Sequence, residues 1–426
     1  MSHFRRLLPL LGARWPTLVS PGVLSPLASF SRAQVGSLSS AVLADGATRV
    51  EFGADVRRFN GAARRLLIEG QRINGLRNPR CEGATAGVLG SGGAMPTNWT
   101  LAVAGGVTIE VVGVVTSGGV QCLRLAITGT ATAGANLSLV LEGATVIAAT
   151  VGQAWTGSAF LARDPGGGAT PNIQLRFLEH NSAGTQLVAS PGANETVSAS
   201  LSRVSRVYTT TQATCAFIRS FLTIGVLNGS TYNTTLDVGW QQLELGAFAS
   251  TPILPPVGTP GASTRGADLV AAPLAGLGIS DNGACTIVGT FMLPQMAPAS
   301  AQQVLVQIDG GSETQRIFLR NGAGANSLVL GKVGGGSTTI AVGSLSAGQV
   351  FRCGFTVDGA GRVVASLNGA APVEVTGALT SGFTTLRLGD SAAAVASMFG
   401  EVGTVLILPR PVSDAELQAR VAALPL

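Results

Sequence analysis

The sequence is poor in charged residues, in aromatic residues and above all in histidine. Charged side chains make up 12% of the 426 residues and aromatic side chains 5%. Exposed faces of helices need many lysines and glutamates, so this composition favours thin, turn-rich β structure over packed helices. The two histidines are His3 and His180. A His-rich zinc site is therefore excluded, and a Ser-His-Asp triad would have to rely on one histidine outside the N-terminus.

Cysteines are few and far apart in the chain, and they form no Cys-x-x-Cys pair. This spacing indicates neither a zinc site nor a disulfide framework, and we expect the thiols to stay reduced. The five cysteines are Cys81, Cys122, Cys215, Cys285 and Cys353.

Long apolar runs are also missing. No segment reaches the ~18 uninterrupted apolar residues of a membrane span, so no membrane insertion is expected. The apolar run near the N-terminus is cut short by Pro9 and Arg14. It does not reach the ~7–15 residues that the core of a signal peptide needs.

Glycine, by contrast, is abundant, with 58 residues, and hydrophobic residues make up 46% of the chain. Short runs of alternating character follow one another, each bounded by Gly, Asn, Ser or Pro. Leu175 and Phe177, for example, alternate with Gln174 and Arg176, which places one face of a strand inward and the other outward. Over this many antiparallel strands, the pattern predicts an all-β chain with two jelly-roll sandwiches.

The division of the chain follows from prolines and from one capping pattern. Prolines crowd a short stretch after residue 250, where no central strand can run. Ser413 and Glu416 form a capping box, which predicts one short C-terminal helix. We predict an extended N-terminal arm with a docking segment over residues 1–80, a first sandwich over 81–250, a Pro-rich linker over 251–263 and a second sandwich over 264–426.

The positive charge is small overall but concentrated near the N-terminus. A net charge of +5 gives no strong signal for nucleic acid at this length. The arginines within the first 80 residues indicate either docking onto an acidic partner or nucleic acid, or a solvated basic face. The residues predicted to make the docking contact are Arg5, Arg6, Trp15, Arg57 and Arg58.

Several motifs resemble those of a family of particle proteins. Phe30-Ser-Arg-Ala33 and Arg65-Leu-Leu-Ile-Glu-Gly-Gln-Arg-Ile-Asn74 resemble a signature of phage head-spike and tail-fibre proteins and of related gene transfer agent particles. Ile73 stands where that family usually has Thr. Trp240-Gln-Gln-Leu-Glu-Leu-Gly-Ala-Phe248 and Thr264-Arg-Gly-Ala-Asp268 are similar to the exit of the carbohydrate-binding-module-like jelly roll in the same proteins.

The C-terminal half is similar to concanavalin A-like or laminin-G-like jelly rolls. The similarity lies in a strand-turn-strand at Asp358–Gly369, in Phe399-Gly-Glu-Val-Gly403 and in the final helix. Together the resemblances imply a structural component of the virion surface, assembled in the cytoplasm of a bacterial host. The implied partners are other virion proteins at a capsid vertex, spike or tail, and host surface polysaccharide. The Ala/Gly-rich, weakly charged surface favours a homo-oligomer.

Sugar binding would use aromatic faces, with polar side chains that fix hydroxyl groups. Trp155 lies between Gly152 and Gly157, which favours a loop, whereas Trp240 precedes a strand-like run and is expected in the core. The predicted carbohydrate-binding residues are Trp155, Trp99, Tyr208 and Tyr232.

Metal binding and catalysis have weaker sequence support. Asp309 and Glu313 would supply oxygens to calcium at ~2.3–2.6 Å, although the segment is more simply a turn. No other cofactor is predicted.

The Glu-x-Asp-x-x-Glu strand of concanavalin A-like glycanases is missing and the acids are scattered, which favours a non-enzymatic protein. Gly-rich runs at 166–168 and 334–336 lack the lysine of a phosphate loop and are predicted to be hairpin tips.

The sequence thus predicts a non-enzymatic virion surface protein, a head-spike or tail-fibre subunit that attaches by its N-terminus and binds host polysaccharide. A particle scaffold without any ligand differs from this prediction only in lacking glycan affinity, and the sequence does not separate the two. The other alternative is a secreted glycan-binding protein or glycanase. That alternative requires a cleavable N-terminal signal and paired acids, and both features are weak here.

Overall fold

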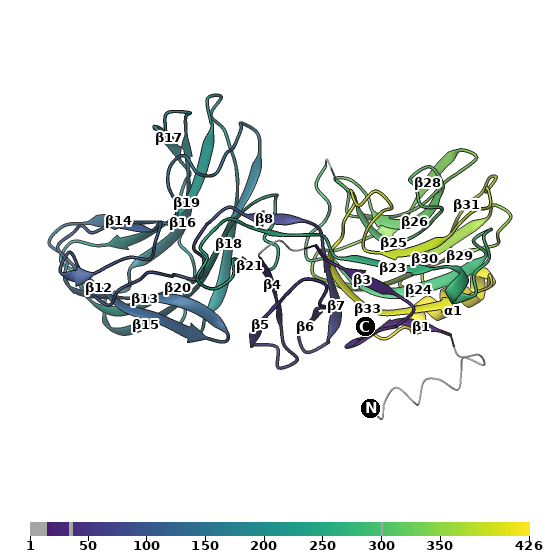
Figure 1. The fold of residues 1–426 in the computed structure, drawn as a ribbon, viewed down its shortest axis with the longest axis horizontal. Helices are drawn as coiled ribbons and strands as arrows, with labels where there is room; N and C mark the ends of the chain where they lie inside the picture. The colour runs from purple at the N-terminus through teal and green to yellow at the C-terminus, as the bar shows by residue number, and fades with distance from the viewer. Residues whose placement is uncertain (1–14, 34–36, 300) are drawn as a thin grey trace.

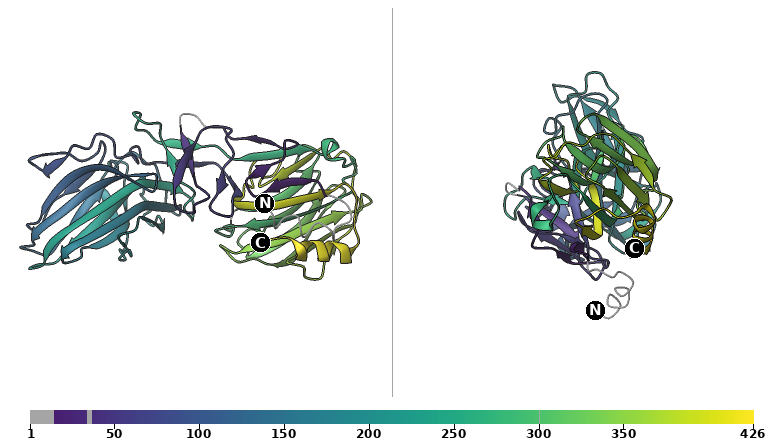
Figure 2. Two further views of the ribbon diagram at one scale, coloured as in Figure 1. Left: turned by 90° about the horizontal axis from the view of Figure 1, so that it is seen from below. Right: turned by 90° about the vertical axis from the view of Figure 1, so that its right-hand side faces the viewer.

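A computed structural model describes residues 15–33, 37–299 and 301–426. Within these ranges nearly all regular secondary structure is β-strand, and the one α-helix, α1 (Asp414–Ala423), lies near the C-terminus. Two sandwiches lie end to end, with a small region of short strands between them (Figures 1 and 2). The prediction of an all-β chain with sandwiches and a single C-terminal helix is confirmed.

The first sandwich pairs a seven-stranded sheet with a five-stranded sheet. Their inward residues form one core, in which Leu125, Leu222 and Leu236 are fully buried. The larger sheet has the order β10 (Gly92–Gly93), β9 (Gly87–Leu89), β12 (Thr108–Ser117), β13 (Val120–Thr130), β20 (Thr231–Leu245), β15 (Ala154–Gly168) and β18 (Ser202–Thr209). The smaller sheet has the order β11 (Thr100–Ala102), β14 (Ala135–Val140), β19 (Phe217–Val226), β16 (Asn172–His180) and β17 (Gln186–Ala189).

The second sandwich has its own core, which includes Ile308, Phe355 and Leu386. One sheet has the order β2 (Val23–Leu24), β1 (Thr17–Ser20), β33 (Phe399–Leu408), β24 (Cys285–Met292), β29 (Val350–Val357), β30 (Val363–Leu367) and β31 (Val373–Val375). In addition, β7 (Arg65–Glu69) pairs with β33, and β6 (Phe59–Asn60) pairs with β7. The other has the order β28 (Ser337–Ser344), β27 (Ser327–Val333), β26 (Arg316–Asn321), β25 (Gln303–Asp309), β32 (Thr385–Leu388), β23 (Leu269–Pro273) and β3 (Ser29–Ser31).

The N-terminal segment differs from the separate extended arm that we predicted. Strand β1 pairs with β33, and β3 pairs with β23, so the described residues before Ala33 belong to the second sandwich. The physical reason is burial, because Leu18, Val19 and Leu24 are at most 4% exposed in the core of that sandwich. A free arm would leave these side chains in water.

The Pro-rich stretch also differs from the linker that we predicted. Within it, β21 (Ile253–Leu254) is buried and pairs with β4 (Leu38–Val42), whose other neighbour is β5 (Arg49–Phe52). At its end, β22 (Ser263–Arg265) pairs with β8 (Arg72–Asn74). The chain before the first sandwich and the chain after it are therefore joined by strand pairing.

Two further local predictions have different outcomes. Ser413 caps α1 as predicted, since its side chain accepts a hydrogen bond from the backbone N–H of Glu416. Gly166–Gly168 do not form a hairpin tip, because they continue β15, which pairs with β20 across a bulge. Among the described residues, no helix is long and apolar enough to cross a membrane.

All five cysteines lie in the described part of the chain, where each is buried and unpaired. Burial raises the pKa of Cys285 to about 12 and raises the pKa of Cys353 strongly. Because the thiolate is the reactive form, we expect no cysteine of the native protein to react with Ellman's reagent within minutes. After denaturation in guanidinium all five should react. Fast labelling of the native protein would contradict this packing.

Candidate functional site

Three of the four predicted sugar-binding aromatics lie in the core of the first sandwich. Trp99, Trp155 and Tyr232 are 5%, 7% and 1% exposed. Trp155 stands in β15, not in a loop, and its indole N–H donates to the side chain of Gln153. The Tyr232 hydroxyl accepts from the backbone N–H of Leu227 at 2.8 Å. The prediction that these three residues form a sugar platform is wrong, because their rings are covered by the two sheets.

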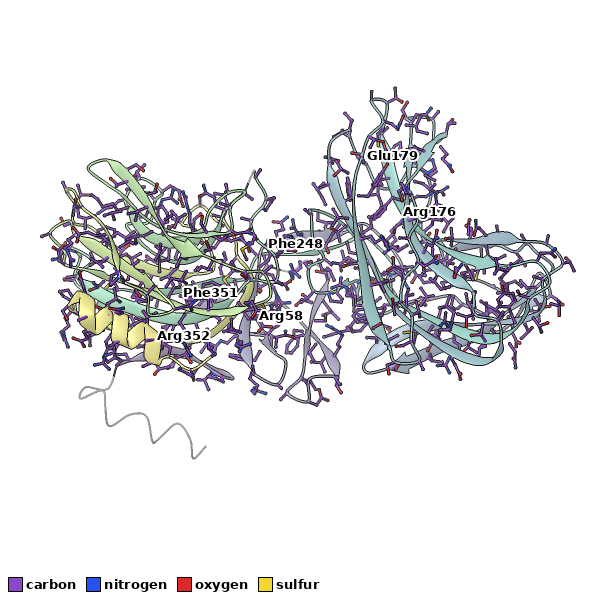
Figure 3. The ribbon with its side chains drawn as sticks, turned by 180° about the vertical axis from the view of Figure 1, so that it is seen from behind. Arg58, Arg176, Glu179, Phe248, Phe351 and Arg352 are labelled. Atoms are coloured by element: carbon purple, nitrogen blue, oxygen red, sulfur yellow. The ribbon has the colours of Figure 1, made fainter. Side chains whose placement is uncertain are left out.

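The fourth aromatic, Tyr208, is half-buried at one end of the first sandwich. Its ring stacks on Phe177 at 5.3 Å, and its hydroxyl donates to Glu179, a residue labelled in Figure 3. Burial and this hydrogen bond raise the pKa of Tyr208 to about 12. Burial alone would raise the pKa of Glu179, but hydrogen bonds from Tyr208 and Thr211 and from the backbone of Gln212 lower it. Tyr208 thus orders a buried carboxylate, and its hydroxyl is already engaged.

The predicted calcium ligands do not form a site. Asp309 is fully buried, and its carboxylate accepts from Arg387 and from the backbone N–H of Gly311. Glu313 instead pairs with Arg316. Each carboxylate thus has its own arginine, and in the described ranges no group of three or more His, Cys, Asp or Glu residues is arranged to hold a metal ion.

The predicted docking residues are scattered. Arg5 and Arg6 lie outside the described residues. Trp15 is 8% exposed and packs with α1, where the guanidinium of Arg420 lies 5.0 Å from the centre of its ring. Arg57 is exposed, whereas Arg58 is fully buried in ion pairs. Trp15 and Arg58 therefore cannot form a docking surface, because neither presents its side chain to solvent.

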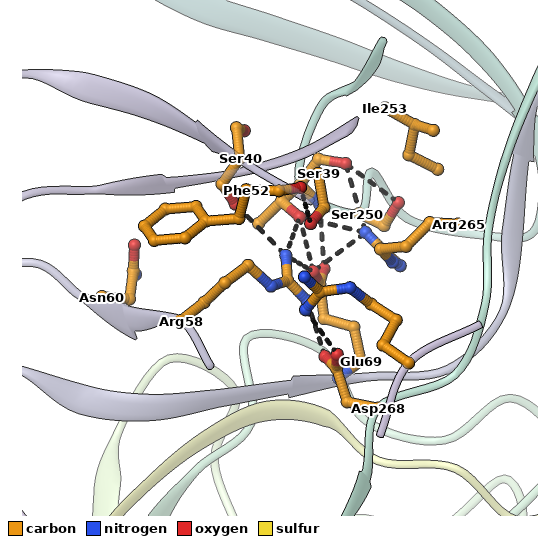
Figure 4. A network of polar contacts seen from close by, with 12 residues as sticks. Ser39, Ser40, Phe52, Arg58, Asn60, Glu69, Ser250, Ile253, Arg265 and Asp268 are labelled. Atoms are coloured by element: carbon orange, nitrogen blue, oxygen red, sulfur yellow. Dashed lines mark hydrogen bonds and ion pairs between the residues drawn. The ribbon is translucent and has the colours of Figure 1, made fainter. Parts of the chain in front are cut away.

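Arg58 instead belongs to a buried ion-pair cluster between the two sandwiches, shown in Figure 4. We call Arg32, Arg58, Glu69, Arg265 and Asp268 the junction; none is more than 4% exposed. Arg58 lies 2.8 Å from Glu69 and 2.6 Å from Asp268. Arg32 lies 2.9 Å from the second oxygen of Asp268, and Arg265 lies 2.9 Å from Glu69. Three guanidinium groups and two carboxylates are thus shielded from bulk solvent.

A second set of contacts extends the junction on the side of the first sandwich. The guanidinium of Arg72 lies 5.0 Å from the ring centre of Phe248 and 4.5 Å from that of Phe399. Arg72 also lies 3.5 Å from the carboxylate of Glu244. Because Phe248 follows the last strand of the first sandwich and Phe399 begins β33, one arginine contacts both sandwiches.

The junction is built mainly from the motifs that resemble those of particle proteins. Four of its five residues, all except Arg58, come from the three segments Phe30–Ala33, Arg65–Asn74 and Thr264–Asp268. Asn74 adds a further link, because its amide donates to the backbone carbonyl groups of Gln241 and Ile253. Segments more than 200 residues apart therefore converge on one structural joint, and sequence alone could not show this because the strand pairing that unites them is long-range.

The junction should make folding stability depend on acid. Burial alone would raise the pKa of Glu69. The positive charges of Arg265 and Arg58 outweigh this effect and lower the pKa from an ordinary value of 4.5 to about 2. A depressed carboxyl pKa stabilises the fold above pH 4.5, and this stabilisation is lost as the pH falls toward 2. We expect the free energy of unfolding, measured by urea denaturation, to fall by on the order of 3 kcal/mol across this window. Glu69→Gln should flatten that slope; an unchanged slope would contradict the assignment.

A shallow pocket lies elsewhere, on the outer face of the five-stranded sheet. The inward residues of these strands, such as Leu137, Ile173 and Ile224, are in the core, so the alternate residues face outward. Asn136, Gly225 and Asn172 stand side by side on β14, β19 and β16. Gly225 has no side chain, so a gap opens between the two asparagines. The pocket there has a volume of about 380 Å³ and is lined by Gly134, Ala135, Asn136, Asn172, Gln174, Thr223, Gly225, Val226 and Leu227.

Hydrogen-bonding groups surround this pocket. The amide of Gln174 donates to Asn194 at 3.0 Å and accepts from the hydroxyl of Thr223 at 3.4 Å, which fixes its orientation. Asn136 and Asn172 are exposed, and their side chains form no hydrogen bond with the described residues. Leu227, which is 61% exposed, adds an apolar edge. Sequence reasoning missed the site because its signal, amides at outward positions of neighbouring strands, depends on the register between strands.

Neither protein-family models nor curated proteins match the sequence. Among solved structures, the chain is similar to the CBM40 of Ruminococcus gnavus IT-sialidase bound to α2,3-sialyllactose, with 15% identity, a TM-score of 0.29 and coverage of 34% of this chain and 86% of that one.

Two other structures cover more of the chain. Mouse laminin α1 domains LG4-5 have 12% identity, a TM-score of 0.24 and coverage of 67% and 93%. The CBM22-1–CBM22-2 tandem of Paenibacillus barcinonensis Xyn10C has 12% identity, a TM-score of 0.24 and coverage of 77% and 99%. The two sandwiches of this chain are defined by its own strand pairing.

Proposed function

We propose that this chain is a non-enzymatic, glycan-binding protein of the surface of a phage or gene transfer agent particle, a head-spike or tail-fibre subunit. The pocket between Asn136 and Asn172 is the observation that carries the glycan-binding part. The motifs at Phe30–Ala33 and Arg65–Asn74 support the particle part, through their resemblance to particle proteins. The same proposal includes attachment to the particle through the N-terminal segment. Of the predicted docking residues that the structure describes, Arg57 is the one exposed to solvent.

The chemistry of the pocket suits a sugar ring. A sugar hydroxyl both donates and accepts hydrogen bonds, and an amide side chain does both through one carbonyl oxygen and two N–H groups. Asn136 and Asn172 present such amides on opposite sides of Gly225, where a ring can lie between them. Leu227 gives the C–H face of the ring an apolar contact. A ligand held in this way replaces its hydrogen bonds to water with hydrogen bonds to the amide side chains.

The same lining argues against catalysis at this site. Glycoside hydrolysis needs two carboxyl groups, one on each side of the bond that breaks. The nine residues that line the pocket include no Asp, Glu, His or Cys. No general acid or base therefore faces a ligand bound there, which supports binding without turnover.

The shallow site also explains why particle display would matter. A ligand gains roughly 0.3 kcal/mol per non-hydrogen atom, so one hexose of about 12 such atoms would bind with about 4 kcal/mol, a Kd on the order of 1 mM. Many copies on one particle raise the overall avidity by about 10²–10⁴ when several sites bind together. We therefore propose a homo-oligomer fixed to other virion proteins, with host surface polysaccharide as its ligand.

Electron microscopy tests the particle part directly. Particles purified from cells with and without the gene should differ by one discrete projection at a capsid vertex or on the tail. Antibody labelling of the chain should mark that projection. Identical particles, with the protein found free in the medium, would refute the particle role and favour a secreted glycan-binding protein or glycanase.

A further inference from the structure

We infer that the pocket selects a neutral sugar unit over an acidic one, an inference that rests on the proposed glycan binding at the same site. The starting observation is its lining, in which the polar side chains are Asn136, Asn172, Gln174 and Thr223. All four are uncharged. A ligand carboxylate or sulfate placed there would lose its hydration without gaining a cation in return, which is costly.

An arginine that projects from the same face beside the pocket is already engaged. Arg176 follows Gln174 by two residues on β16, so both side chains project from the same face, and Figure 3 labels Arg176. Its Nε and Nη2 donate to the backbone carbonyl of Ser190 at 2.8 and 2.6 Å. Its guanidinium also lies 5.5 Å from the ring centre of Phe221. These contacts hold the guanidinium on the sheet surface instead of over the pocket.

Three other arginines of this region also have partners, since Arg163 donates to the backbone carbonyl of Pro171 at 3.4 Å. Arg206 forms an ion pair with Glu195, and Arg219 donates to the backbone carbonyl of Glu142 at 3.5 Å. Glu142 in turn pairs with Arg77 at 2.6 Å. Arg206 and Glu142 are thus neutralised by their ion-pair partners, whereas Arg176 and Arg219 are held on backbone carbonyl groups and do not belong to the pocket lining.

The amides, in contrast, match a neutral ligand. The unpartnered amides of Asn136 and Asn172 offer two carbonyl acceptors and four N–H donors, and the fixed amide of Gln174 adds a donor. Hydroxyl and acetamido groups can use both kinds of group at once. A carboxylate accepts only, so it can use the N–H donors of these amides but leaves their two carbonyl oxygens without a donor.

The test compares matched pairs of oligosaccharides on the full chain. Immobilised neutral glycans and their acidic counterparts, for example lactose with 3′-sialyllactose and galactotetraose with tetragalacturonate, are probed at about 20 mM and about 500 mM salt. In whichever pair shows binding, we expect the affinity for the neutral glycan to exceed that for the acidic glycan by at least ~10-fold. The affinity for the neutral glycan should change by less than about 2-fold between the two salt concentrations. Gly225→Val should remove that binding, and Arg176→Gln should leave it within about 2-fold, because Arg176 lies outside the pocket.

Each other outcome counts against the inference. Tighter, salt-sensitive binding of the acidic member, weakened by Arg176→Gln, overturns the selectivity but leaves the proposed glycan binding standing. Neutral binding that survives Gly225→Val places the site elsewhere and overturns the inference. Binding of no glycan in the panel, with the variants folded as judged by circular dichroism, overturns the inference together with the proposed function.

Discussion

Replacing Asp268 with asparagine is expected to lower the free energy of unfolding by about 3–5 kcal/mol, because it breaks a fully buried set of ion pairs. Asp268 is 1% exposed and accepts from Arg32 and Arg58, and it also accepts from the backbone N–H of Glu69 at 2.9 Å. Without its charge, three buried guanidinium groups would share the single carboxylate of Glu69. Urea denaturation of the full chain measures the effect.

A matched control is available on the surface. Arg362 pairs with Glu374, but both side chains are more than one-third exposed. Glu374→Gln should therefore change the free energy of unfolding by less than about 1 kcal/mol. If Asp268→Asn proved as mild as this control, the junction would not be the joint that holds the two sandwiches and the N-terminal segment together.

Gly225→Val is expected to abolish glycan binding while the fold keeps its stability. Gly225 has no positive φ, and a Cβ built there would meet the Asn136 side-chain oxygen at 3.3 Å and the Cβ of Asn172 at 3.5 Å. Asn136 is exposed and can shift by a few tenths of an ångström. A β-branched side chain suits a strand but would fill the gap between the two asparagines. Affinity for the immobilised polysaccharide should fall by at least ~10-fold, since most of the contact would be lost.

Gly167→Val is the control for this prediction. Gly167 lies on β15 in the same sandwich, also without a positive φ, and a Cβ there would meet nothing within 4 Å. This variant should bind like the unmodified protein. The pocket assignment would be wrong if both valine variants bound equally well, or if only the Gly167 variant lost binding.

The fold class was predictable because it depends on local patterns. Alternation at Leu175 and Phe177 gives the inward face of β16, and the capping box at Ser413 gives the start of α1. The longest strands were harder to predict. Ala154–Gly168 contains glycine, alanine and proline, which have low strand propensity, and it is held in β15 by pairing with β18 and β20 on both sides.

The sites were less predictable because they depend on register and long-range contacts. The flanking glycines of Trp155 indicate a loop, yet burial against the opposite sheet places that ring in the core. Arg58 belongs to a basic cluster in the sequence, but its partners Glu69 and Asp268 are fixed only when β7 reaches β33 and the chain returns at β23. The N-terminal segment was predicted to be an extended arm, whereas strand pairing and buried apolar side chains place its described residues in the second sandwich.

Adsorption of particles to host polysaccharide is the most direct test of the central claim. Particles would be assembled with the unmodified chain, with Gly225→Val or with Gly167→Val, and their adsorption compared after electron microscopy has checked the projections. The account predicts that Gly225→Val particles keep the projection but lose adsorption, whereas Gly167→Val particles keep both. The account would be contradicted if Gly225→Val particles adsorbed fully, or if particles without this chain adsorbed fully.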